Sequence, residues 1–142
     1  MTLPVQFLNL DHLVIRCADL AVMQHFYGTV LGCTLERALD EQGLYQYRAG
    51  TALIDLVDIE KPIGKGLSPD PQRRNMAHFC LRIEDGDWDK IITHFRESGI
   101  DIDKAPGRRY GADGYGQSLY LRDPEGNEVE LKMSPEPGTG IG

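Results

Sequence analysis

Apolar and polar residues along the chain alternate with strand and helix periods, and the same order of periods occurs twice. The first half predicts a strand over 10–17 and then an amphipathic helix over 20–31, for which Asp19 is the N-cap and Gly32 the C-terminal stop. Shorter alternating runs follow, separated by turn residues. They predict strands over 33–38, 44–48 and 51–58.

The second half repeats this order. A strand is predicted over 76–83 and a helix over 87–98, which ends at Gly99. The later strand predictions are 100–103, 117–122 and 127–133. The glycine-rich stretch 106–116 is either an exposed hairpin or a mobile lid that grips an acidic substrate.

This internal repeat predicts one domain over 1–142 that consists of two modules. Module one is expected at about 9–59 and module two at about 76–133. The intervening stretch 60–75 is rich in Pro and Gly without periodicity, so we expect a linker. The end of the chain, 134–142, is expected to be a flexible tail.

Composition narrows the class of protein. The formal net charge is −7, which argues against a nucleic-acid surface, and the basic linker residues are expected to be solvated. No apolar run approaches the roughly 20 residues of a membrane span, and the N-terminus lacks a signal-peptide pattern. Three scattered cysteines fit reduced thiols. We therefore expect a cytoplasmic protein without membrane or nucleic-acid partners. The basic linker residues are Lys61, Lys65, Arg73 and Arg74.

A histidine at the start of an apolar strand occurs in each half, and a carboxylate inside a later apolar strand follows it. The pairs are His12 with Asp55 and His78 with Glu130. Strand alternation places His12 and Arg16 on the face opposite to the apolar residues. Four N and O ligands suit Zn, Ni, Co, Mn or Fe(II), and a bound ion could polarise a substrate oxygen while a carboxylate moves a proton.

These histidine strands, the segment Leu53–Leu56 and the run Tyr120–Leu131 resemble the vicinal oxygen chelate superfamily over about 9–133. That superfamily includes glyoxalase I, extradiol dioxygenases, fosfomycin-modifying enzymes and bleomycin-binding proteins. The resemblance implies an α+β fold in which two paired βαβββ modules form a U-shaped mixed sheet, with helices on the outer face and a metal inside. It also implies a homodimer.

The ligand pattern is most similar to that of glyoxalase I, whose set falls on His12, Asp55, His78 and Glu130. Glyoxalase I carries Glu where this chain has Asp55. The resemblance implies that Asp55 is a fourth ligand or base. The alternatives are an acceptor that orients a ligand histidine and a solvated residue at the sheet edge.

Two further positions match substrate-binding residues of relatives. Arg16 matches an arginine of glyoxalase I that contacts the glutathione carboxylate, which allows glutathione as a co-substrate. Tyr120 matches a tyrosine of the fosfomycin thiol transferases. Each comparison has a departure, since Ile59 stands where glyoxalase I has asparagine and Val14 where the thiol transferases have threonine.

The resemblance implies a metal-dependent lyase or isomerase of the glyoxalase type. It would hold one divalent ion per site and act on a small substrate chelated through vicinal oxygens, with Glu130 or Asp55 moving the proton. Two alternatives stay open. One is a non-catalytic protein that binds a drug or metabolite, and the other is a small Fe(II) ring-cleaving dioxygenase.

Overall fold

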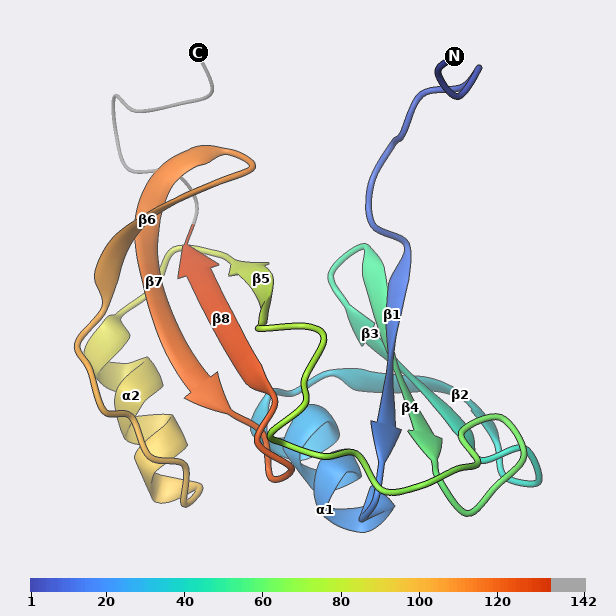
Figure 1. Cartoon of the computed structure of the whole chain (residues 1–142). Coiled ribbons are helices and arrows are strands. Elements are labelled where there is room, and N and C mark those ends of the chain that lie inside the picture. The colour runs from blue at the N-terminus through green and yellow to red at the C-terminus, as the bar shows by residue number, and fades with distance from the viewer. Residues whose placement is uncertain (134–142) are drawn as a thin grey trace. The chain divides into compact units, whose positions relative to one another are not determined.

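The computed structural model describes residues 1–133, so the expected tail 134–142 lies outside the described residues. The chain divides into two compact units, Met1–Pro69 and a second that begins at Asp70. Each unit contains one four-stranded mixed sheet (Figure 1). In the described residues, no helix is long and apolar enough to cross a membrane.

The first unit is built around a sheet with the strand order β1-β4-β3-β2, in which β1 and β4 are parallel and the other pairs antiparallel. A helical segment connects β1 to β2. The elements are β1 (His12–Cys17), α1 (Leu20–Gln24), η1 (His25–Val30), β2 (Thr34–Leu39), β3 (Leu44–Ala49) and β4 (Ala52–Asp58).

The helical segment of this unit begins where the sequence predicts. The Asp19 carboxylate accepts a hydrogen bond from the Val22 amide at 3.4 Å, which caps α1. The second half of the segment differs from the expected α-helix, because η1 is a π-helix whose last turn is closed by the Leu31 amide donating to the Phe26 carbonyl. Gly32 then leaves the helix with a φ of +78°.

The two faces of the first sheet differ in polarity. Apolar side chains of β1, β4 and the helical segment are buried together, and they include Ile15, Cys17, Phe26 and Leu56. The alternate residues of β1 and β4 lie on the other face, as strand geometry requires. Asp55 is among them, and it is buried although it lies outside the apolar core.

The second unit repeats the arrangement with the strand order β5-β8-β7-β6, in which β5 and β8 are parallel. Its helix begins after the N-cap Asp87, whose side chain accepts from the Asp89 amide at 2.9 Å. The elements are β5 (Phe79–Ile83), α2 (Trp88–Glu97), β6 (Gly107–Gly111), β7 (Gly114–Arg122) and β8 (Glu128–Met133).

The strand predicted over 100–103 is wrong. The Ile100 amide donates to the Phe95 carbonyl at 2.8 Å and so completes the end of α2 instead of joining a sheet. Ile102 is buried without strand pairing, which explains why an alternating apolar pattern occurs there. The missing strand lies further on, because the glycine-rich stretch 106–116 forms the hairpin of β6 and β7.

The turn before β8 is fixed by a linker residue that we expected to be solvated. Arg74 donates to the Asn127 side-chain oxygen at 2.6 Å and to the Glu125 carbonyl at 2.9 Å. The Asp123 carboxylate accepts hydrogen bonds from the Asn127 amide and side chain inside the same turn. The solvated prediction is therefore wrong for Arg74. Apart from the strand at 100–103, the expected α+β fold of two βαβββ modules is confirmed.

Candidate functional site

The two carboxylates predicted from the repeat occupy equivalent positions in their sheets. Asp55 of β4 lies opposite Val14 of β1 and Gln46 of β3. Glu130 of β8 has the same kinds of neighbour, with Cys80 of β5 on one side and Tyr120 of β7 on the other. Each carboxylate therefore lies on the second strand of its sheet. The neighbouring edge strand begins at His12 in the first unit and directly after His78 in the second.

Asp55 is the centre of the polar face of the first unit. It is only 4% exposed. Its Oδ2 accepts a hydrogen bond from the Gln46 side-chain amide at 3.1 Å, whereas its Oδ1 is fully enclosed and has no partner among the described residues. Enclosing a carboxylate oxygen without a donor costs free energy. This oxygen is therefore one that would gain from accepting a hydrogen bond or binding a cation.

His12 begins β1, and its imidazole is oriented by the residue before it. Nδ1 lies 2.6 Å from the Asp11 carboxylate. This hydrogen bond raises the pKa of His12, and the nearby charge of Asp55 acts in the same direction. A carboxylate at Nδ1 favours the tautomer with the proton on Nδ1, which leaves the Nε2 lone pair for a metal or a substrate.

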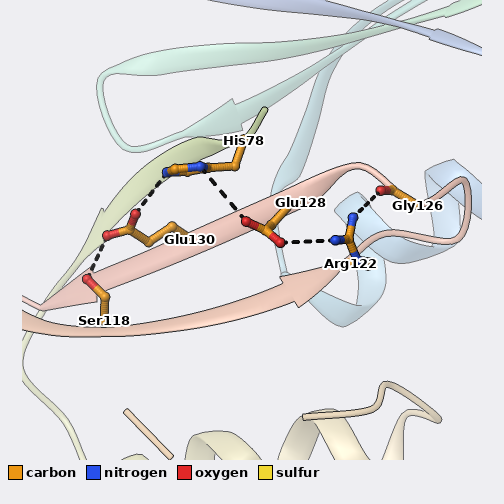
Figure 2. Close-up of polar contacts among 6 residues, drawn as sticks. All are labelled: His78, Ser118, Arg122, Gly126, Glu128 and Glu130. Atoms are coloured by element: carbon orange, nitrogen blue, oxygen red, sulfur yellow. Dashed lines mark hydrogen bonds and ion pairs between the residues drawn. The ribbon is translucent and has the colours of Figure 1, made fainter. Parts of the chain in front are cut away.

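Glu130 is the centre of a denser network in the second unit (Figure 2). Its Oε1 lies 3.1 Å from His78 Nε2, and the buried Ser118 hydroxyl donates to its Oε2 at 2.7 Å. The Tyr120 hydroxyl and the Cys80 thiol also donate to this carboxylate. Burial alone would raise the pKa of Glu130, but these hydrogen bonds and the charge of His78 together lower it.

His78 lies between two carboxylates of β8. Its Nδ1 is 3.9 Å from Glu128, and Glu128 is in turn held by Arg122 at 3.2 Å (Figure 2). Both candidate histidines therefore have an acid near Nδ1, but only His12 is within hydrogen-bond distance of it, through Asp11. A hydrogen bond at Nδ1 is the arrangement by which proteins orient metal-ligating imidazoles, whereas His78 is held through Nε2 by Glu130.

Two groups around Glu130 hold their protons more tightly than usual. Burial and the adjacent Glu130 carboxylate raise the pKa of the Cys80 thiol to about 12. Burial and the same carboxylate also raise the pKa of Tyr120, while Arg109 opposes the shift. Arg109 lies over the Tyr120 ring, 5.6 Å from its centroid. Both groups therefore stay neutral donors at neutral pH.

The second unit contains a cavity of about 840 Å³ beside this network. His78, Ser118, Tyr120, Arg109 and Glu128 line it, together with the segment that follows α2. Its size suits a small organic molecule. The segment 99–105, part of which was predicted to be a strand, borders this cavity, whereas β7 pairs with β6.

Arg16, the predicted contact for a substrate anion, is bound on one side. Its Nε donates to the Gly64 carbonyl at 2.8 Å. Its Nη2 is enclosed and has no partner in the described residues. The side chain is thus fixed by the linker, and it retains one unsatisfied donor.

The model of the Glyoxalase/Bleomycin resistance protein/Dioxygenase superfamily matches residues 9–131. The chain belongs to this superfamily. Its repeated βαβββ modules and the equivalent positions of Asp55 and Glu130 agree with that membership.

Named relatives within the superfamily are diverse. The chain is 36% identical over 124 residues to the glyoxalase domain-containing protein RDO1 of Mycosarcoma maydis, covering 87% of this chain and 66% of RDO1, just under two thirds of its length. It is 30% identical to virulence protein STM3117 of Salmonella typhimurium strain LT2, covering 88% and 83%. The crystal structure of STM3117 superposes with a TM-score of 0.69 at 26% identity, covering 92% and 99%. Metallothiol transferase FosB of Shouchella clausii is 35% identical over 46% of each chain.

The donor set of this superfamily member fits a divalent metal ion. Among residues 1–133, no three His, Cys, Asp or Glu side chains come together as a group that could hold an ion. Each unit does offer one imidazole and one carboxylate, and the atoms His78 Nε2 and Glu130 Oε1 are close enough to bind one ion together. In the first unit, the partnerless Asp55 Oδ1 is a donor atom of suitable chemistry.

Sequence reasoning missed four residues that orient the candidate ligands. They are Asp11, Gln46, Ser118 and Glu128. An acid directly before His12 was a usable signal, and Glu128 lies two residues from Glu130 on the same face of β8. Gln46 and Ser118 had no such signal, because only the strand register brings them to the carboxylates.

Proposed function

We propose that this chain is a metal-dependent lyase or isomerase of the glyoxalase type, acting on a small substrate chelated through vicinal oxygens. The observation that carries the proposal is the matched pair of half-sites. His12 with Asp55 and His78 with Glu130 recur at equivalent positions of the two sheets, and an acid lies 2.6 Å from Nδ1 of His12 and 3.9 Å from Nδ1 of His78. The free cysteines suit action in the cytoplasm, which is part of the proposal.

In this proposal His12, Asp55, His78 and Glu130 serve one divalent ion per site, in a homodimer. Two imidazoles and two carboxylates suit Zn, Ni, Co, Mn or Fe(II). The bound ion would supply Lewis-acid polarisation of a substrate oxygen. The superfamily membership supports a divalent ion, and the enclosed Asp55 Oδ1 supports it independently.

The residues of the chain have distinct roles in the reaction. Glu130 Oε2 is held by Ser118, so Oε1 is the oxygen available on the His78 side. A carboxylate there, or Asp55 Oδ1 in the other unit, takes a proton from the carbon next to the substrate oxygen and returns it to the product. The Tyr120 hydroxyl, which lines the cavity and stays protonated, contacts a substrate oxygen.

Arg16 is proposed to bind an anionic group of the substrate or of glutathione as a co-substrate. Its unsatisfied Nη2 supports this role, since an enclosed guanidinium donor without an acceptor costs free energy. Its bond to Gly64 would keep the donor in place. Because Ile59 stands where glyoxalase I has asparagine, the use of glutathione is to be tested by a direct activity assay.

The test combines elemental analysis of the purified protein with an assay of methylglyoxal and glutathione. We expect close to one divalent metal ion per chain in the wild type and loss of that metal in His78→Ala, with unchanged folding by circular dichroism. His25→Ala is the matched control, because His25 is an exposed histidine of η1 outside both half-sites. Metal content that survives in His78→Ala would contradict the proposed site. Full metal content without turnover would exclude the glyoxalase I reaction alone.

The cavity also favours a second function, binding of a drug or metabolite without catalysis. Its volume and its mixed aromatic and polar lining would suit that role. Metal-free wild-type protein whose ligand affinity is unchanged by His78→Ala would support the binding protein. A ring-cleaving dioxygenase would instead require Fe(II) and consume oxygen with a catechol.

A further inference from the structure

Each candidate carboxylate faces a neutral hydrogen-bond donor across its sheet, and each donor is itself held by an arginine. In the first unit Gln46 of β3 lies opposite Asp55 of β4, and Arg37 of β2 lies opposite Gln46. Gln46 Nε2 donates to Asp55 Oδ2 at 3.1 Å, and Arg37 Nη1 donates to Gln46 Oε1 at 3.5 Å. Three adjacent strands thus supply one row of hydrogen bonds that ends at the carboxylate.

The chemistry of this row fixes the orientation of the Gln46 amide. A guanidinium group carries only donors, so it requires the amide oxygen, whereas a carboxylate requires the amide nitrogen. Arg37 on one side and Asp55 on the other therefore select the same one of the two amide orientations. Asp55 Oδ2 is thereby kept occupied, and the enclosed Oδ1 is the oxygen left for a cation.

A β-bulge brings the arginine into the row. The register of β2 against β3 shifts at Glu36, so that Arg37 lies opposite Gln46. Regular pairing would instead place Glu36 opposite Gln46, and a carboxylate cannot donate to the amide oxygen. In the observed register Glu36 forms an ion pair with Arg48 at 2.6 Å. The bulge therefore places a donor where regular pairing would place an acceptor.

The second unit contains a row of the same kind. Tyr120 of β7 lies opposite Glu130 of β8, and its hydroxyl donates to this carboxylate. Arg109 of β6 lies over the Tyr120 ring, 5.6 Å from the centroid, and donates to the hydroxyl oxygen. Because a hydroxyl has one proton and Arg109 occupies its acceptor side, the proton is directed toward Glu130. A substrate oxygen in the cavity would have to compete with Glu130 for that proton.

Arg109 is exposed, yet its guanidinium has a fixed place. Its Nη1 donates to the Arg108 carbonyl at 2.8 Å. A Cβ added to Gly107 would lie 3.1 Å from that nitrogen, so the absence of a side chain at Gly107 leaves the space that the guanidinium occupies. Gly107, Arg109 and Tyr120 also line the cavity of the second unit. The arginine is therefore held beside Tyr120 before any ligand binds.

We propose that Arg37 and Arg109 are positioning residues of the candidate site, each of which acts through the neutral donor that it holds against a carboxylate. The same order of arginine, neutral donor and carboxylate occurs in both modules, although the donors differ in type. A guanidinium bound directly to either carboxylate would compete with a metal ion for its oxygens, and the intervening donor avoids that competition. The inference rests on the proposed function in one respect, the role of Asp55 and Glu130 in holding an ion.

NMR spectroscopy of metal-free protein tests the first row. We expect Arg37→Met to shift the side-chain amide resonances of Gln46, because the amide oxygen loses its donor, with folding unchanged by circular dichroism. Lys65→Met is the control, since it removes an equal charge at an exposed residue of the first unit. It should leave the Gln46 resonances in place.

The second row is tested in the same way with tyrosine labelled at Cζ, whose resonance reports hydrogen bonding of the hydroxyl. We expect both Arg109→Met and Gly107→Ala to shift the Tyr120 signal, because the alanine methyl displaces the guanidinium without changing the charge. Arg108→Met is the matched control, since Arg108 lies over the ring of Tyr115, 3.6 Å from its centroid. It should leave the Tyr120 signal in place.

A double-mutant cycle on zinc affinity tests whether each arginine acts through its donor. By isothermal titration calorimetry we expect Arg37→Met to weaken zinc binding about threefold and Gln46→Met about tenfold. Arg37→Met should add nothing in the Gln46→Met background, because its contact is already lost. Arg109→Met should likewise add nothing to Tyr120→Phe, which lacks the hydroxyl.

The spectra and the cycles separate this inference from the proposed function. Equal effects of Arg37→Met and Lys65→Met on the Gln46 resonances, or fully additive losses of zinc affinity in either cycle, would overturn the inference. Shifted resonances in a protein that binds no zinc would support the two rows and contradict the metal-dependent enzyme. Zinc binding by variants with unshifted resonances would do the reverse.

Discussion

The two half-sites share one plan but differ in how completely their carboxylates are satisfied. Glu130 accepts hydrogen bonds from Ser118, Tyr120 and Cys80 and lies beside His78. Asp55, at the equivalent sheet position, accepts from one donor, Gln46, and its enclosed Oδ1 has no donor among residues 1–133. The second unit therefore stabilises its carboxylate by itself, whereas the first unit leaves one carboxylate oxygen without a donor.

This contrast indicates that the two carboxylates play different parts. A carboxylate held by several donors is oriented before any ligand arrives and has a lowered pKa, as Glu130 does. A carboxylate with an unfilled oxygen gains most from binding a cation. We therefore expect Glu130 to contribute to the fold with or without metal, and Asp55 to contribute mainly when metal is bound.

The largest expected effect is that of Glu130→Gln on the metal-free protein. The amide cannot accept from Ser118, Tyr120 and Cys80 together, so we expect the free energy of unfolding to fall by about 2–3 kcal/mol. Urea denaturation at pH 7 measures this difference. A loss below about 0.5 kcal/mol would show that the network does not stabilise the fold.

The same variant gives a pH dependence with a definite sign. Because the folded pKa of Glu130 lies below 4.5, the stabilisation from its ionised form is present above the unfolded pKa and is lost as pH falls through the folded value. The difference in stability between wild type and Glu130→Gln should therefore shrink in acid below pH 4.5. A difference that grows in acid would contradict the assigned ionised state.

The turns before the two carboxylate strands allow a second test of the comparison. The β3–β4 turn in the first unit is short and uses Gly50 with a φ of +60°, whereas the longer β7–β8 turn is held by Arg74. We expect Arg74→Ala to lower the free energy of unfolding by about 1–2 kcal/mol through the two lost hydrogen bonds. Arg73→Ala is the control, since Arg73 is exposed and lies 3.7 Å from Asp70, and it should cost less than about 0.5 kcal/mol. Equal losses in the two variants would exclude the proposed role of Arg74.

Sequence patterns were sufficient for most of the fold because the strands that carry the apolar core alternate clearly. They failed where local pattern and pairing disagree. The run Ile100–Asp103 alternates like a strand, but its first amide completes α2. The segment Gly107–Gly116 contains few apolar residues, yet it pairs as β6 and β7 because Arg108 and Tyr115 stack across the hairpin and glycine fits its curvature.

The candidate site was predictable as far as the repeat extends. His12, His78 and the two carboxylates recur in both halves, so the sequence alone could pair them. The residues that orient them depend on register between strands far apart in the sequence. Ser118 reaches Glu130 across β7 and β8, and the side chain of Lys132 packs against Gly111 of the hairpin. No local pattern encodes those contacts.

Asp55→Asn is the direct counterpart of Glu130→Gln, and we expect it to be nearly neutral in metal-free protein. Asparagine retains a partner in Gln46 and removes an enclosed anionic oxygen, so the free energy of unfolding should change by less than about 1 kcal/mol. In the presence of excess divalent metal, by contrast, wild type should gain stability that the variant lacks. A variant as unstable as Glu130→Gln without metal would remove the distinction between the two carboxylates.

The smallest expected effect concerns His12, whose orientation depends on one neighbour. Because the folded pKa of His12 is raised above 6.5, mainly by Asp11, its ionic contact with Asp11 is fully present below pH 6.5 and is lost as pH rises through the folded value. Asp11→Asn should therefore lower the pKa of His12 toward 6.5 in metal-free protein, as measured by NMR titration of the imidazole. Glu41→Gln, which changes an exposed acid elsewhere in the first unit, should leave the titration unchanged. If Asp11→Asn also leaves it unchanged, Asp11 does not orient His12, and the carboxylate at Nδ1 would be a feature of the second half-site alone.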